Sequence, residues 1–150
     1  MHLKFIQKGA CVSCLWGLLF FSSCKTQKDS LVEPQKDFSG TWRISKVERN
    51  STDITAWADT SSFRLMLASD GSYTLQNNHI PFLVNQVGGT WASDDPLYPF
   101  FLSFKGTDST NAKTGSITTP ISGGERSIEM TFSPGCPSNT YVYTFIKTNQ

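Results

Sequence analysis

The four cysteines are the residues of this chain with the most reactive side chains. Cys11 and Cys14 have the C-x-x-C spacing of a redox pair, but that motif needs a helix N-terminus on a βαβ scaffold to lower a thiol pKa. Here the pair lies inside an apolar N-terminal run. Cys136 lies between Gly135 and Pro137 in a predicted turn, with no histidine nearby in the sequence to act as its base. We therefore expect neither redox nor nucleophilic chemistry from these thiols.

The remaining titratable residues do not form a catalytic or metal-binding pattern. His79 is the one histidine beyond the N-terminal segment, and a single histidine does not make a usual zinc site. Asp94 and Asp95 precede a proline, which favours a turn over a hard-cation site. Glu125 and Glu129 lie four residues apart in a predicted strand, so their side chains share one face of it. Such a pair could serve in acid–base catalysis, but we interpret it as part of a solvent-exposed face. We predict no catalytic residues, no metal and no cofactor.

Residues 1–23 have the layout of a signal peptide that ends just before Cys24. Lys4 and Lys8 precede the mostly apolar run from Ala10 to Phe21, which is well short of the roughly 20 residues that a membrane-spanning helix needs. The two serines before Cys24 resemble the end of the bacterial lipobox, in which the cysteine becomes the first residue of the mature protein and carries lipid. We expect Cys24 to be the lipid attachment site. An ordinary cleaved signal and an uncleaved anchor are the alternatives.

Residues 24–37 are polar, contain one proline and show no apolar period, so they are predicted to be a flexible tether. A flexible chain of this length holds a domain roughly 20 Å from its anchor. Lys25 follows the cysteine where an aspartate is associated with retention in the inner membrane, which favours the outer membrane. The scarcity of acidic residues in "KTQKD" favours the periplasmic face over the cell surface.

The charges give no indication of a polyanionic partner. The chain has 13 Lys and Arg against 12 Asp and Glu, and they are scattered rather than clustered, so we expect no nucleic acid as a partner. Removal of the two lysines in residues 1–23 leaves 11 basic and 12 acidic residues, a net charge of 11 − 12 = −1. The membrane is therefore expected to hold the protein through the lipid on Cys24 and not through basic side chains.

Residues 38–150 are predicted to form one all-β domain. Apolar and polar residues alternate in short segments, and the clearest pair is a hairpin that runs from Phe63 to Leu75 and turns at Asp70-Gly71. The alternation after Trp42 changes phase near Lys46, which predicts a β-bulge. About eight short antiparallel strands at regular spacing indicate a closed barrel, with a β-sandwich as the alternative.

The start of this domain carries a family resemblance. Gly40-Thr41-Trp42 forms a "G-x-W" first strand soon after the lipobox, and "SDGSYTL" at 69–75 and a second "GTW" before "DDPLYPFFLSF" at 94–104 follow it. In these features the chain resembles lipocalin-like lipoproteins of Bacteroidota, a group of uncharacterised domains. The resemblance implies an eight-stranded antiparallel lipocalin-like barrel and no established catalytic activity.

Aromatic residues are the remaining candidates for a binding site. Three of them, Trp57, Phe82 and Tyr98, fall in predicted loops at one rim of the barrel. An exposed aromatic side chain in a loop lowers solubility, which suggests that it has a function. We expect them to bind a small apolar molecule or a glycan, and the alternative for these residues is that they fold over the barrel end as plugs. The alternative is a non-enzymatic structural or protein-interaction accessory protein whose barrel is filled by its own side chains. The predicted interior residues are Trp42, Phe63, Leu65, Tyr73, Leu75, Trp91, Leu102, Phe104, Met130 and Phe132.

Overall fold

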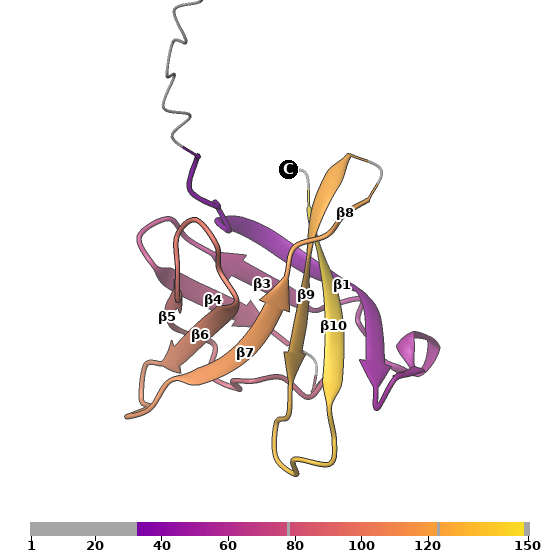
Figure 1. The fold of residues 1–150 in the computed structure, drawn as a ribbon. Helices are drawn as coiled ribbons and strands as arrows, with labels where there is room; N and C mark the ends of the chain where they lie inside the picture. The colour runs from indigo at the N-terminus through magenta and orange to yellow at the C-terminus, as the bar shows by residue number, and fades with distance from the viewer. Residues whose placement is uncertain (1–32, 78, 123, 149–150) are drawn as a thin grey trace, which may run out of the picture. The chain divides into compact units, whose positions relative to one another are not determined.

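Eight antiparallel strands close into a barrel in the computed structural model, which describes residues 33–77, 79–122 and 124–148 (Figure 1). In barrel order the strands are β1 (Gly40–Arg49), β3 (Arg64–Leu67), β4 (Ser72–Gln76), β5 (Gly88–Ser93), β6 (Phe101–Gly106), β7 (Lys113–Thr118), β9 (Glu125–Phe132) and β10 (Tyr141–Lys147). β10 pairs with both β9 and β1, which closes the sheet. The predicted all-β barrel is confirmed, and the sandwich alternative is wrong because one continuous sheet forms the wall.

Three short elements are attached to this wall. The two-residue strand β2 (Thr52–Asp53) pairs with the end of β1, and the 3-10 turn η1 (Thr55–Trp57) follows it. The two-residue strand β8 (Ile121–Ser122) pairs with the start of β9. All three lie in connections, so they shape the two ends of the barrel and not its wall.

The predicted hairpin and bulge are both present. β3 and β4 pair in a register that sets Leu65 opposite Leu75 and Leu67 opposite Tyr73, and Gly71 takes the positive φ of 83° that the turn requires. The register of β1 against β10 shifts between Ile44 and Lys46, as a bulge requires. Because side chains alternate across a strand, the shift returns Val47 to the interior side.

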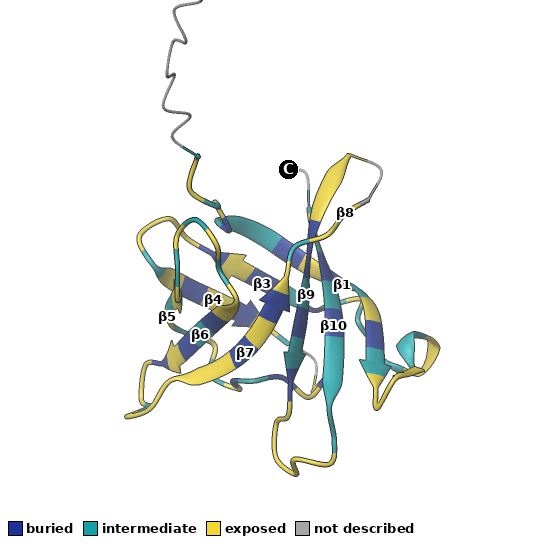
Figure 2. Cartoon of the chain, viewed as in Figure 1, coloured by how far each residue is buried: buried dark blue, intermediate teal, exposed yellow. Residues whose placement is uncertain are grey.

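Buried residues recur along the barrel strands (Figure 2), and their side chains form one hydrophobic cluster. Of the ten predicted interior residues, all except Trp91 are buried. Trp91 is half-buried at the barrel end, where its ring meets that of Phe38 edge to face at 6.4 Å and its indole N–H donates to the carbonyl of Ala68 at 3.0 Å. Within the described residues, the buried hydrophobic side chains extend from Phe38 to Phe145.

The connections divide between two ends of the barrel, which we name by their contents. The tether end holds the chain's entry at residues 33–39, the β3–β4 turn, the β5–β6 loop (94–100) and the β7–β9 connection. The cap end holds the β1–β3 connection (50–63), the β4–β5 connection, the β6–β7 loop and the β9–β10 loop. In Figure 1 the tether end is at the top and the cap end is toward the bottom.

The β4–β5 connection folds inward instead of forming an exposed loop. Ile80, Phe82 and Val84 of this cap segment, residues 79–87, are buried and belong to the barrel core. The prediction that Phe82 is an exposed rim residue is therefore wrong, and the alternative, a plug over the barrel end, describes this residue. Alternating apolar side chains at positions 80, 82 and 84 point to one side of an extended segment, so they enter the barrel end together.

Candidate functional site

The three aromatic residues that the sequence singled out do not meet. The side chain of Trp57 is 82 % exposed at the cap end, and that of Tyr98 is 58 % exposed at the tether end. Phe82 is buried beneath the cap segment. The prediction of a single rim that carries all three is wrong, because Trp57 and Tyr98 lie at opposite ends of the barrel. Cys24, the predicted lipid attachment site, lies outside the described residues.

Trp57 lies beside a cleft of about 460 Å³ between the β1–β3 connection and the cap segment. The apolar lining includes Val47, Ile54 and Ile80, which belong to or pack against the barrel core. Trp57 and the two tyrosines of β10 supply aromatic lining. We call this site the cap-end cleft. Its size lies within the range of small-molecule sites, about 300–1,000 Å³.

Hydrogen bonds fix the turn that presents Trp57. The Thr55 hydroxyl accepts from the backbone N–H of Val47 at 2.9 Å, and the N–H of Ile54 donates to the Val47 carbonyl at 2.9 Å. The Asp53 carboxylate accepts from the Thr55 N–H at 2.9 Å. Hydrogen bonding to the side chain of Thr55, followed by that to its backbone, lowers the pKa of Asp53. The η1 turn is thus attached to β1. Trp57 is an exposed aromatic side chain on a held backbone, not on a loose loop.

Arg49 supplies positive charge at the edge of the cap-end cleft. Its guanidinium lies 5.9 Å from the ring centre of Tyr141 and donates to the Asn139 side-chain oxygen at 2.7 Å. The neighbouring Asn50 pairs with Thr140 through two hydrogen bonds, at 2.8 and 2.9 Å. These contacts join the end of β1 to the β9–β10 loop and hold the cation over an aromatic face.

Polar groups of the cap segment complete the lining. His79 is one of the residues that line the cap-end cleft, and its backbone takes a positive φ of 64°. Asn77 brackets this turn by donating to the Ile80 carbonyl at 2.7 Å and accepting from the Ile80 N–H at 3.0 Å. The buried Tyr143 donates its hydroxyl to the Pro81 carbonyl, which ties the cap segment to β10. Burial raises the pKa of Tyr143.

A model of one protein family matches residues 23–146, and its description is "Domain of unknown function (DUF5004)". The chain belongs to this family. No curated protein and no solved structure matches the chain. Because the match begins one residue before Cys24 and ends in β10, the DUF5004 region includes the predicted tether as well as the whole barrel core.

The two adjacent aspartates of the DUF5004 domain, Asp94 and Asp95, have structural partners. The carboxylate of Asp94 accepts the N–H groups of Phe100 and Phe101 at 3.0 and 2.9 Å, and that of Asp95 accepts those of Leu97 and Tyr98 at 2.7 and 2.8 Å. The turn predicted for this acidic pair is therefore present. Within the described ranges, no cluster of three or more His, Cys, Asp and Glu side chains is placed to hold a metal ion.

The thiol of Cys136 is free and exposed in the β9–β10 loop of the DUF5004 domain. Hydrogen bonding to the backbone of Ser138, followed by that to its side chain, lowers the pKa of the thiol. Among the residues that the structure describes, no helix is long and apolar enough to cross a membrane.

Two buried tyrosines of the DUF5004 domain provide a matched test of the cap. Tyr143→Phe removes the hydroxyl that donates to Pro81 and is expected to lower the free energy of unfolding by roughly 1–2 kcal/mol. The buried Tyr73 hydroxyl has no hydrogen-bond partner within the described residues, so Tyr73→Phe is expected to leave stability unchanged or to raise it. Urea denaturation measures both. Equal losses in the two variants would contradict a structural role for the Tyr143 bond.

Proposed function

We propose that this protein is a lipid-anchored binding protein of the bacterial outer membrane, whose cap-end cleft takes a small apolar molecule or a glycan. The observation that carries the proposal is the exposed Trp57 on a fixed turn beside a cleft of about 460 Å³. A large exposed aromatic side chain costs solubility, and a held backbone keeps it in place for a ligand. The proposed binding activity needs no catalysis.

The chemistry of the lining limits the ligand. Trp57 and Tyr141 offer flat apolar faces, and Val47, Ile54 and Ile80 add aliphatic surface. Polar groups from Arg49, Asp59 and His79 lie among them. An apolar lining with a few polar groups is the usual composition of small-molecule sites. A sugar ring, with apolar faces and a rim of hydroxyls, fits this mixture as well as a small apolar molecule does.

The barrel interior is not the proposed site, because its own side chains occupy it. Phe63, Phe104, Tyr143 and Phe145 are fully buried, and their rings pack around that of Phe82. This filled interior favours a second candidate function, a structural or protein-interaction accessory protein without a small ligand. The two candidates differ in whether the cap-end cleft binds anything.

The anchor and its location belong to the same proposal. The signal-peptide layout of residues 1–23 supports attachment of lipid at Cys24, and Lys25 after the cysteine supports the outer membrane. The mature chain has a net charge of −1, so basic side chains do not attract it to the membrane. The lipid is therefore the main attachment of the protein to the membrane. We propose that the barrel faces the periplasm, because the residues after Cys24 are poor in acidic side chains.

Native mass spectrometry of the protein purified from its own host, without its leader, tests the binding proposal. A small molecule that co-purifies with the barrel would support it, and its mass would separate a glycan from an apolar molecule. A ligand-free spectrum, together with no thermal shift across lipid and glycan panels, would overturn it. That result would favour the accessory protein.

Trp57→Ala is expected to weaken binding of any ligand so found by about 30-fold, because truncation of a tryptophan that acts as a binding hot spot costs about 2 kcal/mol or more. Titration calorimetry gives the two dissociation constants. Phe100→Ala is the matched control, since its ring is 64 % exposed but lies at the tether end. Unchanged affinity in Trp57→Ala, or an equal loss in both variants, would contradict the placement of the ligand in the cap-end cleft.

A further inference from the structure

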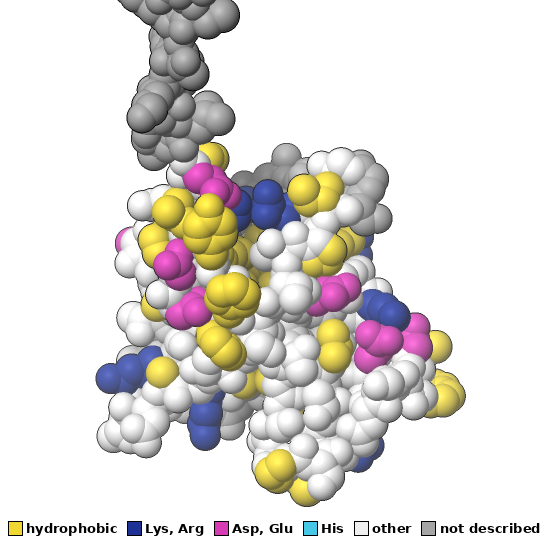
Figure 3. Space-filling view, viewed as in Figure 1, with side chains coloured by type: hydrophobic (Ala, Val, Ile, Leu, Met, Phe, Trp, Pro, Cys, Tyr) yellow, Lys and Arg dark blue, Asp and Glu magenta, His cyan; other side chains and the backbone are white. Residues whose placement is uncertain are grey.

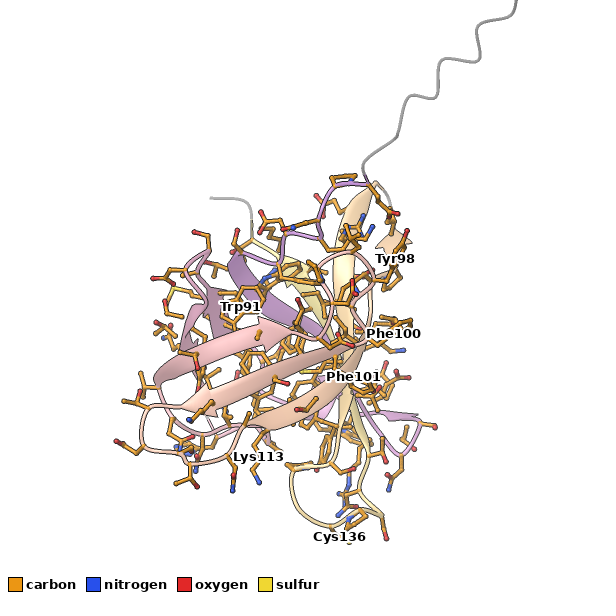
Figure 4. The ribbon with its side chains drawn as sticks, turned by 60° about the vertical axis from the view of Figure 1, so that its left-hand side comes forward. Trp91, Tyr98, Phe100, Phe101, Lys113 and Cys136 are labelled. Carbon is orange, nitrogen blue, oxygen red and sulfur yellow. The ribbon has the colours of Figure 1, made fainter. Side chains whose placement is uncertain are left out.

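A second aromatic surface lies at the tether end of the barrel. Tyr98, Phe100 and Phe101 are 58, 64 and 44 % exposed, and they come from the β5–β6 loop and the first residue of β6. Figure 3 shows hydrophobic side chains gathered over this part of the molecule, and Figure 4 shows the three labelled rings along one side. We call these three residues the tether-end patch. Three exposed aromatic rings within four residues of the chain provide apolar surface of the kind that marks an interaction site.

The backbone beneath the tether-end patch is held in place. The Asp94 carboxylate binds the N–H groups of Phe100 and Phe101, and the Asp95 carboxylate binds the N–H group of Tyr98. The carbonyl of Phe100 accepts the N–H of Ile117 in β7 at 2.7 Å. The rings are therefore presented in a fixed arrangement, and an occupant that contacts them need not order the loop first.

The chain enters the barrel across this same patch. The Tyr98 hydroxyl donates to the Glu33 carboxylate, and the N–H of Lys36 donates to the Pro96 carbonyl at 2.8 Å. Glu33 is 33 − 24 = 9 residues after Cys24. A flexible segment of that length spans about 17 Å on average and at most about 30 Å when fully extended. A lipid on Cys24 therefore keeps the patch within reach of the membrane that holds it.

The charges near the patch indicate how it would contact a bilayer. Glu33, Asp94 and Asp95 lie beside the three rings, and Lys36 is paired with Glu33 at 3.0 Å. Such a surface gains nothing from anionic headgroups. Aromatic side chains, and tyrosine especially, are enriched at the membrane–water interface because the ring is apolar and the hydroxyl is polar. A neutral phospholipid surface is thus the occupant that fits the chemistry.

We propose that the tether-end patch rests on the surface of the membrane that carries the lipid anchor, an inference that rests on the proposed anchoring at Cys24. The contact fixes the orientation of the barrel. Because Trp57 and the cap-end cleft lie at the opposite end, the cleft faces away from the bilayer and stays open to ligand. The patch itself supplies orientation, while the acyl chains supply most of the membrane affinity.

Tryptophan quenching by brominated lipid tests this orientation. A chain that begins at residue 25 keeps the entire described core, since Phe38 is the first buried residue. It is held through an N-terminal histidine tag on vesicles of phosphatidylcholine with a few nickel-chelating lipids. The probe variant combines Phe100→Trp with Trp57→Phe and Trp91→Phe. The control variant retains Trp57 and carries Trp91→Phe, so that its one exposed indole lies at the cap end.

Brominated acyl chains are expected to lower the emission of the probe variant about twofold and to leave that of the control variant unchanged, because only interfacial aromatics approach the acyl boundary. Absence of quenching in the probe variant would overturn the proposal. It would favour a protein, and not the membrane, as the partner that contacts the tether-end patch. Equal quenching in both variants would also overturn it, because the barrel then has no fixed orientation. If Phe100→Trp does not fold, Phe101→Trp replaces it. Since the tag stands in for the acyl chains, none of these results bears on whether Cys24 is acylated.

Discussion

Phe82→Ala is expected to lower the free energy of unfolding by about 3–5 kcal/mol, which is the range for removal of a buried phenylalanine ring. The ring is 7 % exposed and lies within 5.4–6.4 Å, centre to centre, of five other rings. These belong to Phe63, Phe104, Phe132, Tyr143 and Phe145. Truncation removes all five contacts and leaves a space in the barrel end that rigid strands cannot close. Urea denaturation monitored by circular dichroism measures the change.

Val87→Ala is the matched control for this prediction, because Val87 belongs to the same cap segment and is 72 % exposed. We expect it to change stability by less than about 0.5 kcal/mol. A loss below about 1 kcal/mol in Phe82→Ala would show that the cap segment does not pack in the barrel end. A loss of similar size in both variants would show that the segment is held by its backbone and not by the Phe82 ring.

The strands could be predicted from the sequence because their signal is local. Phe63, Leu65 and Leu67 alternate with polar or exposed positions, and a barrel wall buries every second residue. The bulge near Lys46 was visible for the same reason, as a change of phase within one strand. A feature that depends on the two-residue period needs no knowledge of the rest of the fold.

In the cap segment, too, every second residue is buried, but the other residues of the segment make this pattern hard to see in the sequence. The burial of Ile80, Phe82 and Val84 alternates as in a strand, but in the sequence the apolar Leu83 interrupts the alternation, and Pro81 and the flanking asparagines indicate a loop. Because the segment makes no ladder in the sheet, its buried face is set by the open barrel end that it fills. Three apolar residues at alternate positions in a long connection are the signal that would have identified the segment.

The two glycines of the "GTW" triplets illustrate a limit of local patterns. Gly40 takes a positive φ of 129°, whereas Gly89 is required because a Cβ there would lie 2.0 Å from the Lys105 carbonyl oxygen. Trp42 is buried in the core and donates to the Phe38 carbonyl, while Trp91 is half-buried at the tether end. Identical triplets thus meet different requirements, which only the pairing of the strands reveals.

The separation of Trp57 from Tyr98 follows from the order of the strands. In an up-and-down barrel, successive connections alternate between the two ends. Trp57 lies in the connection after the first barrel strand and Tyr98 in the connection after the fourth, so an odd and an even connection place them at opposite ends. The predicted order of the strands already implies that these two connections lie at opposite ends of the barrel. The sequence alone could not predict the cap-end cleft, because His79 and Tyr141 meet there only when the barrel closes.

Cys24→Ala in the full-length chain is expected to move the protein from the membrane fraction to the soluble fraction. Two or three acyl chains contribute about 0.8 kcal/mol for each buried methylene, which far exceeds what three half-exposed aromatic rings provide. The mature chain has no excess of basic residues to compensate. Detergent phase partitioning after expression in the native host measures the change, and incorporation of labelled palmitate shows whether lipid is attached.

Cys136→Ala is the matched control for the anchor, because its thiol is exposed and free. We expect this variant to remain in the detergent phase and to incorporate label as the unaltered chain does. If Cys24→Ala still partitioned with detergent, and the unaltered chain took up no label, the anchor would have to be an uncleaved leader.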